Sequence, residues 1–396
     1  MRRLCLLLGM PQNRVASIHV VGTNGKTSVS RMTAALLEGH GVSTGAYVSP
    51  HITSWRERVL IRGEPISAEA FNEALERAEQ AAEVADRSAG DEGPVTQFEL
   101  LTAAAFVAFA AARVHYAVIE AGLGGRLDAT NVIPSKLTVL TSVGYDHTEW
   151  LGETLEEIAA EKVAVLRDHT TLLVGEVPEE VNEVIDREVT EKHAKKVRTT
   201  RVASHVVPGY QGENLALAEA AARVVLGDVR PDVLVGFVKR LVSRDFSIRG
   251  RAELVLGDPP AIFDAAHNPD GAKALAVALP ELAGGREVVC CVAILEGKDA
   301  VGIVNCLAPA CAQFVCTEIP PEQIEGSGRP GGRARPALEI AALCQKAGRE
   351  AEAISNPQEA WDRARDLARE RDGVALAAGS HYLLSSIWTE RPAQSS

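Results

Sequence analysis

The sequence lacks an excess of positive charge, paired cysteines and long apolar runs, and each shortage excludes a class of protein. Lysine and arginine number 41 against 53 acidic residues, and the formal net charge of −12 argues against nucleic-acid and membrane-surface partners. The seven cysteines form no C-x-x-C pair, so we expect reduced core thiols rather than a zinc site. No apolar run reaches the roughly 18 residues of a membrane span, and the N-terminal apolar stretch ends too early for a signal peptide. We therefore expect a cytoplasmic protein.

The length of the chain and its alternating patterns predict the fold class. At 396 residues the chain exceeds what one hydrophobic core usually supports, so two domains are expected. Strand patterns alternate with helix patterns in both halves, which predicts α/β domains built on parallel sheets. We predict a P-loop ATPase domain with a parallel sheet at 1–246, a linker at 247–252, and a smaller Rossmann-like α/β domain at 253–396.

The most informative stretch is 18–28, where a short apolar run breaks into a glycine turn and resumes as a helix pattern. The turn and helix start read Gly22, Thr23, Asn24, Gly25, Lys26, Thr27, Ser28. In a phosphate-binding loop, backbone N–H groups and the helix N-terminus hold an anion, the lysine reaches the phosphates, and a hydroxyl faces Mg²⁺. The usual spacing would place a glycine at Val20, so this is a shorter variant. The alternative is an ordinary turn.

Polar residues also follow other predicted strands, at the edge where open α/β sheets bind ligands. Ser49 follows the strand pattern at 44–48, and Glu120 ends a buried one. His147 comes shortly after the pattern at 137–143. A carboxylate at a strand end, followed by glycines, is typical of a nucleotide-linked Mg²⁺ site. A strand-end turn and a structural histidine are the alternatives.

Other polar residues have an ordinary explanation beside a functional one. The predicted polar loop at 52–65 carries Arg56, Arg58 and Arg62, which are either solvated or steer an acidic substrate. Lys162, on the amphipathic pattern at 154–166, would be an unremarkable surface lysine in most proteins. Asn214 near a helix start is usually a cap.

Taken together, these segments resemble the folylpolyglutamate synthase and dihydrofolate synthase family, within the Mur ligase superfamily of ATP-dependent amide-forming enzymes. The resemblance covers nearly the whole chain, and its pieces occur in the family's order: residues 22–28, 49–51, 96–99, 120–131, 146–147, 161–162, Gln211 with Asn214, Arg251, and 264–269. It implies ATP-dependent ligation of L-glutamate to a folate carboxylate through an acyl phosphate. It also implies the use of ATP and Mg²⁺ and action on a folate or dihydropteroate. We further expect a monomer.

The resemblance implies a role for each matching residue. ATP phosphates would be held by residues 22–28, and the ATP site would be completed by Asn214, Arg251 and Asp264. Metal ligands would be Ser49, Glu120, His147 and Lys162. The pterin would lie against Thr96, Gln97, Phe98, Glu99, Leu127, Asp128 and Ala129. Lys26, Lys162 and His267 would take part in catalysis, with His267 facing the nucleotide or the incoming glutamate.

Lys162 carries the most particular expectation. Its segment resembles the family's modified-lysine segment, so we expect a carbamate, formed by CO₂ on the neutral amine, near a second Mg²⁺. A carbamate offers the hard oxygen atoms that Mg²⁺ prefers, whereas an ammonium would be repelled. The alternative is a helix-surface lysine paired with Glu157 or Glu161.

Two rival functions stay open from the sequence. A cell-wall Mur ligase shares the ATP loop, but such enzymes carry a UDP-sugar domain ahead of it, and 21 residues precede Gly22 here. The folate family itself normally has a longer helical segment there, part of which touches the pterin. A non-catalytic P-loop nucleotide-binding protein is the second rival, and it would not need Glu120, His147, Lys162 and Asp264.

Overall fold

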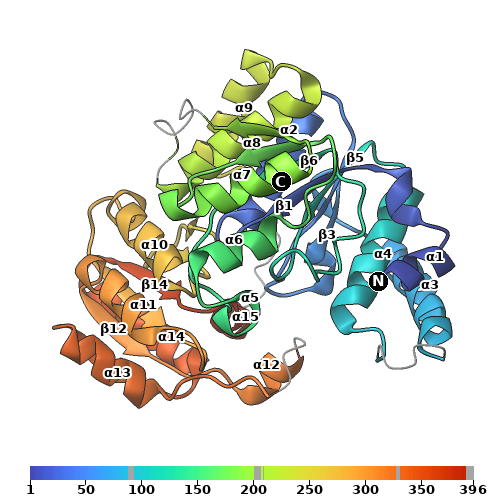
Figure 1. Cartoon of the computed structure of the whole chain (residues 1–396). Helices are drawn as coiled ribbons and strands as arrows, with labels where there is room; N and C mark the ends of the chain where they lie inside the picture. The colour runs from blue at the N-terminus through green and yellow to red at the C-terminus, as the bar shows by residue number, and fades with distance from the viewer. Residues whose placement is uncertain (88–92, 200–206, 208, 327–330, 389–396) are drawn as a thin grey trace. The chain divides into compact units, whose positions relative to one another are not determined.

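The computed structural model describes residues 1–87, 93–199, 207, 209–326 and 331–388, which fall into two compact units (Figure 1). The first unit comprises Met1–Val207 and Gln211–Phe246. The second comprises Pro208–Tyr210 and Ser247–Ser396. Residues 389–396, the end of the predicted C-terminal domain, lie outside the described residues.

The first unit is built on an eight-stranded sheet of order β4-β3-β2-β5-β1-β6-β7-β8. All neighbouring pairs from β2 to β8 are parallel, while β3 and β4 run antiparallel at one edge. The central strands are buried along most of their length, as expected for a parallel sheet covered on both faces. Its strands are β1 (Ala16–Val21), β2 (Thr44–Tyr47), β3 (Val59–Ile61), β4 (Glu64–Pro65), β5 (Tyr116–Glu120), β6 (Leu137–Leu140), β7 (Thr171–Val174) and β8 (Lys195–Arg198).

Helices connect these strands, and capping residues set where two of them begin. Thr96 and Glu99 form a reciprocal capping box at the start of α4, and Thr154 and Glu157 form another at α6. Helix α4 is apolar all round and is buried in the core with α3. The helices of this unit are α1 (Arg2–Leu7), α2 (Lys26–Gly39), α3 (Ala68–Asp86), α4 (Gln97–Ala112), α5 (Thr148–Leu151), α6 (Leu155–Val163), α7 (Asn182–Glu191), α8 (Tyr210–Leu226) and α9 (Pro231–Ser243).

The segment at 52–65 is more ordered than the sequence indicates. A 3-10 helix spans Trp55–Arg58, and β3 and β4 extend the sheet beyond it. Glu57 organises the turn because its carboxylate accepts the backbone N–H groups of Ile52 at 2.9 Å and Ser54 at 3.1 Å. The prediction of a plain polar loop was therefore wrong. The Glu57 side chain holds the turn by hydrogen bonds to backbone N–H groups, and such bonds leave no periodic pattern in the sequence.

The second unit has a six-stranded sheet of order β13-β12-β11-β14-β10-β9, parallel except for β9. Its strands are β9 (Glu253–Val255), β10 (Ala261–Phe263), β11 (Val288–Val292), β12 (Gln313–Cys316), β13 (Glu350–Ala353) and β14 (Val374–Ala378). Its helices are α10 (Pro269–Leu282), α11 (Ala300–Leu307), α12 (Pro321–Gly326), α13 (Ala337–Lys346), α14 (Pro357–Glu370) and α15 (His381–Ile387). The predicted α/β class is confirmed for both units.

The seven cysteines are all free thiols. Six are buried, as predicted for core residues, and Cys306 is partly exposed. Within the described ranges, no helix is both long and apolar enough to cross a membrane.

Candidate active site

The phosphate-loop stretch forms the turn between β1 and α2. Gly25 precedes the first residue of α2 with φ of 85°, a left-handed conformation that favours glycine. A Cβ at Gly25 would lie 2.6 Å from Oδ1 of Asn214, and one at Gly22 would lie 1.9 Å from Oγ1 of Thr141. At both positions a side chain would therefore come too close to a neighbouring residue, which favours glycine in this turn between β1 and α2.

The strand end after β6 fixes this turn. Thr141 Oγ1 donates to the Asn24 carbonyl at 2.6 Å, and the Asn24 N–H donates to Ser142 Oγ at 2.9 Å. Thr23 Oγ1 donates to the Gly144 carbonyl at 3.1 Å and accepts the Gly144 N–H at 3.0 Å. These contacts join segments about 120 residues apart in sequence, so the loop geometry depends on the β1–β6 pairing.

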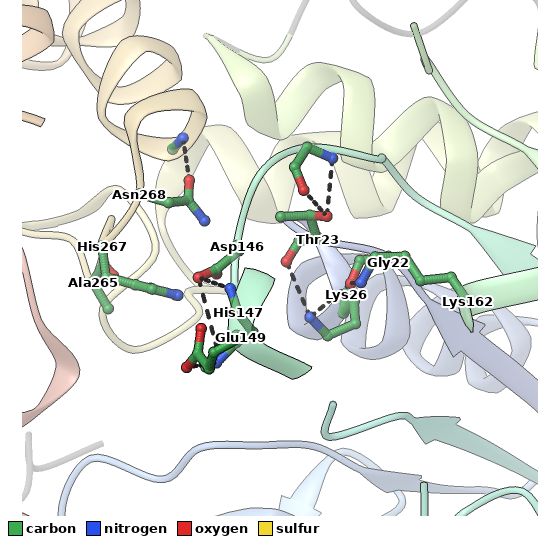
Figure 2. Close-up of polar contacts among 12 residues, drawn as sticks. Gly22, Thr23, Lys26, Asp146, His147, Glu149, Lys162, Ala265, His267 and Asn268 are labelled. Atoms are coloured by element: carbon green, nitrogen blue, oxygen red, sulfur yellow. Dashed lines mark hydrogen bonds and ion pairs between the residues drawn. The ribbon is translucent and has the colours of Figure 1, made fainter. Parts of the chain in front are cut away.

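Lys26 lies over the loop that carries it. Its Nζ donates to the carbonyls of Gly22 and Thr23, each at 3.0 Å (Figure 2). Thr27, the next residue, is buried and turns its hydroxyl to Glu120 Oε1 at 3.1 Å. Ser28 is buried in the first turn of α2.

Three predicted residues meet at the carboxyl ends of β2 and β5. The Glu120 carboxylate is 2% exposed and accepts the Thr27 hydroxyl and, at 3.0 Å, the Ser49 backbone N–H. The Ser49 carbonyl accepts the Thr27 hydroxyl at 3.3 Å. The Thr27 hydroxyl, the Ser49 carbonyl and the Glu120 carboxylate thus bring oxygen atoms together, and oxygen ligands suit a hard divalent cation.

Lys162 is not a surface lysine. It is 3% exposed in α6, and its Nζ donates to the Gly22 carbonyl at 3.1 Å (Figure 2). Burial, reinforced by the charge of Lys26, lowers the pKa of Lys162 from 10.5 to about 7. Glu161 instead pairs with Arg126 at 2.8 Å, so the alternative of a surface ion pair was wrong.

The glycine-rich segment after β5 packs against the end of α6. A Cβ at Gly125 would lie 2.7 Å from the Glu161 carbonyl, and the Arg126 N–H donates to that carbonyl at 3.0 Å. Leu127, at the tip, is 92% exposed. Ala129, two residues on, is buried. The segment is thus anchored at its base and presents an apolar side chain to solvent.

Phe98, in the predicted pterin segment 96–99, packs against Gly122, which precedes the other predicted segment at 127–129. A Cβ at Gly122 would lie 2.5 Å from Cζ of the Phe98 ring. That ring also lies 6.1 Å, centroid to centroid, from Tyr47. Gln97 is exposed at the start of α4, whereas the Glu99 carboxylate is engaged with Thr96 in the capping box. Only part of the predicted set is thus available to a ligand.

Arg58 does not steer substrates from solvent, because its side chain is buried. Its Nε donates to His51 Nδ1 at 2.9 Å, and its guanidinium carbon lies 4.8 Å from the Trp55 ring centroid. Burial, with the charge of Arg58, lowers the pKa of His51 to about 4. The steering hypothesis was therefore wrong for this arginine.

His147 and Asn214 occupy distinct local positions. His147 has φ of 52° and precedes α5, with its Nδ1 3.9 Å from Glu149 Oε1 (Figure 2). Asn214 lies inside α8, which begins at Tyr210, so the interpretation as a helix cap was wrong. Its amide donates to Gln211 Oε1 at 3.0 Å.

In the second unit, Asp264 forms the centre of a compact polar group after β10. It is 3% exposed and accepts the N–H groups of Ala252 at 2.7 Å and Ala266 at 2.8 Å, together with the Tyr210 hydroxyl. Burial raises the pKa of Asp264. His267 Nδ1 donates to the Ala265 carbonyl at 3.0 Å.

The neighbouring Arg251 donates from Nη1 to the Gly250 carbonyl at 3.0 Å. Asn268 caps α10 by accepting the Gly271 N–H at 2.8 Å. The side chains at both ends of the segment 264–268, Asp264 and Asn268, thus accept backbone N–H groups and fix the segment.

Comparisons with known proteins identify both units. The description "Mur ligase middle domain" matches residues 20–218, and "Mur ligase, glutamate ligase domain" matches residues 250–381. The dihydrofolate synthase/folylpolyglutamate synthase of Mycobacterium tuberculosis is 33% identical over an alignment of 409 residues. The alignment covers 94% of this chain and 80% of that protein. The chain belongs to the folylpolyglutamate synthase/dihydrofolate synthase family of Mur ligases.

Solved structures of this family have the same fold. Mycobacterium tuberculosis folylpolyglutamate synthase complexed with ADP and AMPPCP matches with a TM-score of 0.86 and 31% identity, covering 97% of this chain and 93% of that one. A bifunctional folylpolyglutamate synthase/dihydrofolate synthase with Mn, AMPPNP and L-glutamate bound matches with a TM-score of 0.81 and 26% identity, covering 97% and 92%.

The sequence did not identify the residues after β6 that form hydrogen bonds with the phosphate loop. Thr141, Ser142 and Gly144 were not predicted as site residues, although they lie at the end of the predicted strand pattern at 137–143. Their position beside the phosphate loop follows from the sheet order, which places β6 next to β1.

Proposed function

We propose that this protein is an ATP-dependent ligase that joins L-glutamate to a carboxylate of a folate through an acyl phosphate. What supports this most is the convergence of Thr27, Ser49 and Glu120 beside a glycine turn that carries Lys26, in a chain of this family. A protein that only bound nucleotide would not need Lys162 and Asp264 in addition to Glu120 and His147.

The reaction has two steps. A carboxylate oxygen of the folate attacks the γ-phosphorus of ATP, ADP leaves, and an acyl phosphate forms. The amine of glutamate then attacks the acyl carbon, phosphate leaves, and loss of a proton gives the amide. Because positioning and charge neutralisation supply most of such catalysis, the loop N–H groups and Lys26 have the principal role.

The oxygen donors around Glu120 fit a divalent cation, which we propose is Mg²⁺. Thr27, Ser49 and Glu120 would hold it, and His147 is the further candidate ligand on this unit. When bound, the ion neutralises charge on the phosphates. The structure of a related synthase contains Mn, AMPPNP and L-glutamate. This supports a divalent metal, an adenine nucleotide and L-glutamate as ligands.

We propose that Lys162 works as a carbamate. Its pKa of about 7 leaves a substantial fraction of the amine neutral near physiological pH, which CO₂ requires. The nitrogen adds to CO₂ and releases one proton, so the product carries one negative charge. Its place against the Gly22 carbonyl puts that charge beside the phosphate loop.

We propose that the acceptor lies against Phe98, Leu127 and Asp128. Leu127 offers an exposed apolar surface, while Phe98 forms a packed wall behind Gly122. Thr96, Gln97, Glu99 and Ala129 complete the predicted set. Arg251, Asp264 and His267 of the second unit remain predictions for ATP and glutamate. A cytoplasmic monomer also remains a prediction, and the free thiols are in keeping with a reducing compartment.

The experiment is a measurement of ADP release by the purified protein with Mg²⁺ and ATP. L-Glutamate and a reduced folate are each supplied or omitted. The proposal requires release that depends on both. Release that persists without either substrate would indicate a simple ATPase, and binding of ATP without any release would indicate a non-catalytic nucleotide-binding protein.

A further inference from the structure

His19 is a polar side chain in the centre of the first unit's sheet. It lies in β1, three positions before Gly22, and is completely buried. A polar group in such a place is costly unless it forms hydrogen bonds. Its Nε2 lies 2.8 Å from Thr130 Oγ1, whereas its Nδ1 has no partner in the described part of the chain.

The hydrogen-bond partners fix the tautomer of His19. Thr130 Oγ1 donates its only proton to Asp128 Oδ1 at 2.5 Å. The same hydroxyl must therefore accept from the histidine, so His19 carries its proton on Nε2. Burial lowers the pKa of His19 to about 3, and the ring is neutral throughout the range in which an enzyme works.

Asp128 receives further donors. Oδ1 accepts the Thr130 N–H at 2.9 Å, and Oδ2 accepts the Leu123 N–H at 2.9 Å. The carboxylate is thus held between two backbone donors of its own loop and one side-chain hydroxyl. Thr130 is completely buried and its hydroxyl cannot turn to water, so its orientation is set by its contacts with His19 and Asp128.

We propose that His19 and Thr130 are positioning residues that orient the Asp128 carboxylate for the folate acceptor. The chain of donors runs from His19 through Thr130 to Asp128, from the strand that leads into the phosphate loop to the loop proposed to contact the pterin. It thereby fixes the acceptor-binding carboxylate to the same strand that positions the ATP phosphates. This inference rests on the proposed function, which assigns Asp128 to the acceptor.

Substitution of the hydroxyl tests the proposal. Thr130→Val keeps the shape and removes the hydrogen bond, and we expect KM for the folate acceptor to rise about tenfold, the usual effect of losing a bond to a charged group. KM for ATP should stay within about twofold, and Thr130→Ser should restore the acceptor KM. Thr33→Val is the matched control, because Thr33 is equally buried in α2 and its hydroxyl has no partner among the described residues.

Substitution of the histidine gives an independent test. Glutamine can place an amide N–H near the position of Nε2, so His19→Gln should retain most of the acceptor affinity that His19→Leu loses. Nitrogen NMR of the labelled protein should show a neutral His19 with its proton on Nε2. A proton on Nδ1, or equal acceptor KM in the glutamine and leucine variants, would overturn the proposal.

Failure of the proposed function gives a different result. If Asp128→Ala leaves the acceptor KM unchanged, the assignment of Asp128 is wrong, even where NMR confirms the His19 tautomer. If Asp128→Ala raises the acceptor KM while Thr130→Val does not, the assignment stands and the positioning role is wrong. Thermal unfolding of every variant separates a local effect from loss of the fold.

Discussion

Replacement of Lys162 by methionine should make the protein more stable while removing its activity. Lys162 is 3% exposed, and its pKa falls from 10.5 in an unfolded chain to about 7 in the folded one. At 1.36 kcal/mol per pKa unit, this difference corresponds to about 5 kcal/mol of destabilisation at neutral pH. Loss of the hydrogen bond to the Gly22 carbonyl subtracts about 1 kcal/mol or more, so we expect a net gain of about 2–4 kcal/mol.

The pH dependence distinguishes this cause from better packing. Between pH 7 and 10.5 the unfolded chain holds the Lys162 proton and the folded chain does not, so the stability of the wild type rises with pH in this window. Below about pH 7 both states are protonated, and the penalty is constant. The advantage of Lys162→Met should therefore be largest at or below pH 7 and should shrink as the pH rises toward 10.5.

The assay is urea unfolding of both proteins at several pH values from 6.5 to about 9.5, in CO₂-free buffer without nucleotide. Groups distant from Lys162 titrate alike in the two proteins, so their contributions cancel in the difference. Lys136→Met serves as the control, since this lysine is exposed and its replacement should change the free energy of unfolding little. A methionine variant that is less stable than the wild type, or whose advantage is the same at pH 7 and pH 9.5, would refute the reasoning.

Three further predictions concern activity. Lys26→Ala should lower turnover by about 10²-fold or more with little change in the unfolding midpoint, and near-normal turnover in a folded variant would exclude Lys26 from the mechanism. Gly25→Ala should abolish ATP binding measured by calorimetry, because its Cβ would lie 2.6 Å from Asn214; Gly41→Ala, with φ of 81° and nothing within 4 Å, should retain it. Lys162→Ala should lose most turnover, and a small carboxylic acid should restore part of it; full activity without rescue would contradict the carbamate.

Much of the fold was predictable because its elements carry strong local patterns. The sequence of 97–112 favours the helix α4, since an apolar run opened by a capping box has few alternatives. The pattern at 67–87 likewise corresponds to α3. Short or edge elements such as β4 and β9 were not predicted, because two or three residues carry too little periodicity to distinguish a strand from a loop.

The site divides in the same way. The loop from Gly22 to Ser28 is a local signal, a glycine turn between an apolar run and a helix pattern, and the strand-end rule placed Glu120 at the carboxyl end of β5. Contacts such as His19 with Thr130, 111 positions apart, depend on which strands are neighbours and on their register. No local pattern encodes such pairs. The burial of Lys162 was anticipated only through the family resemblance, because an amphipathic helix pattern does not say which of its polar residues faces inward.

A measurement of acceptor specificity would test the bifunctional part of the proposal. The loop that carries Leu127 and Asp128 is anchored at its base by contacts of Gly125 and Arg126 with Glu161, and it is expected to accept the pterin of both substrates. Dihydropteroate and a reduced folate monoglutamate should therefore both support ADP release. Release with the reduced folate alone would leave folate elongation and remove dihydrofolate synthesis.

The central claim, ligation through an acyl phosphate, is tested most directly by transfer of oxygen. The purified protein is incubated with Mg²⁺, ATP, L-glutamate and a folate acceptor whose carboxylate carries ¹⁸O. The masses of the products are then measured by mass spectrometry. We predict a product longer by one glutamyl residue, together with phosphate that contains one ¹⁸O atom from the acceptor. A glutamyl product formed with unlabelled phosphate, or phosphate release without any glutamyl product, would contradict the account.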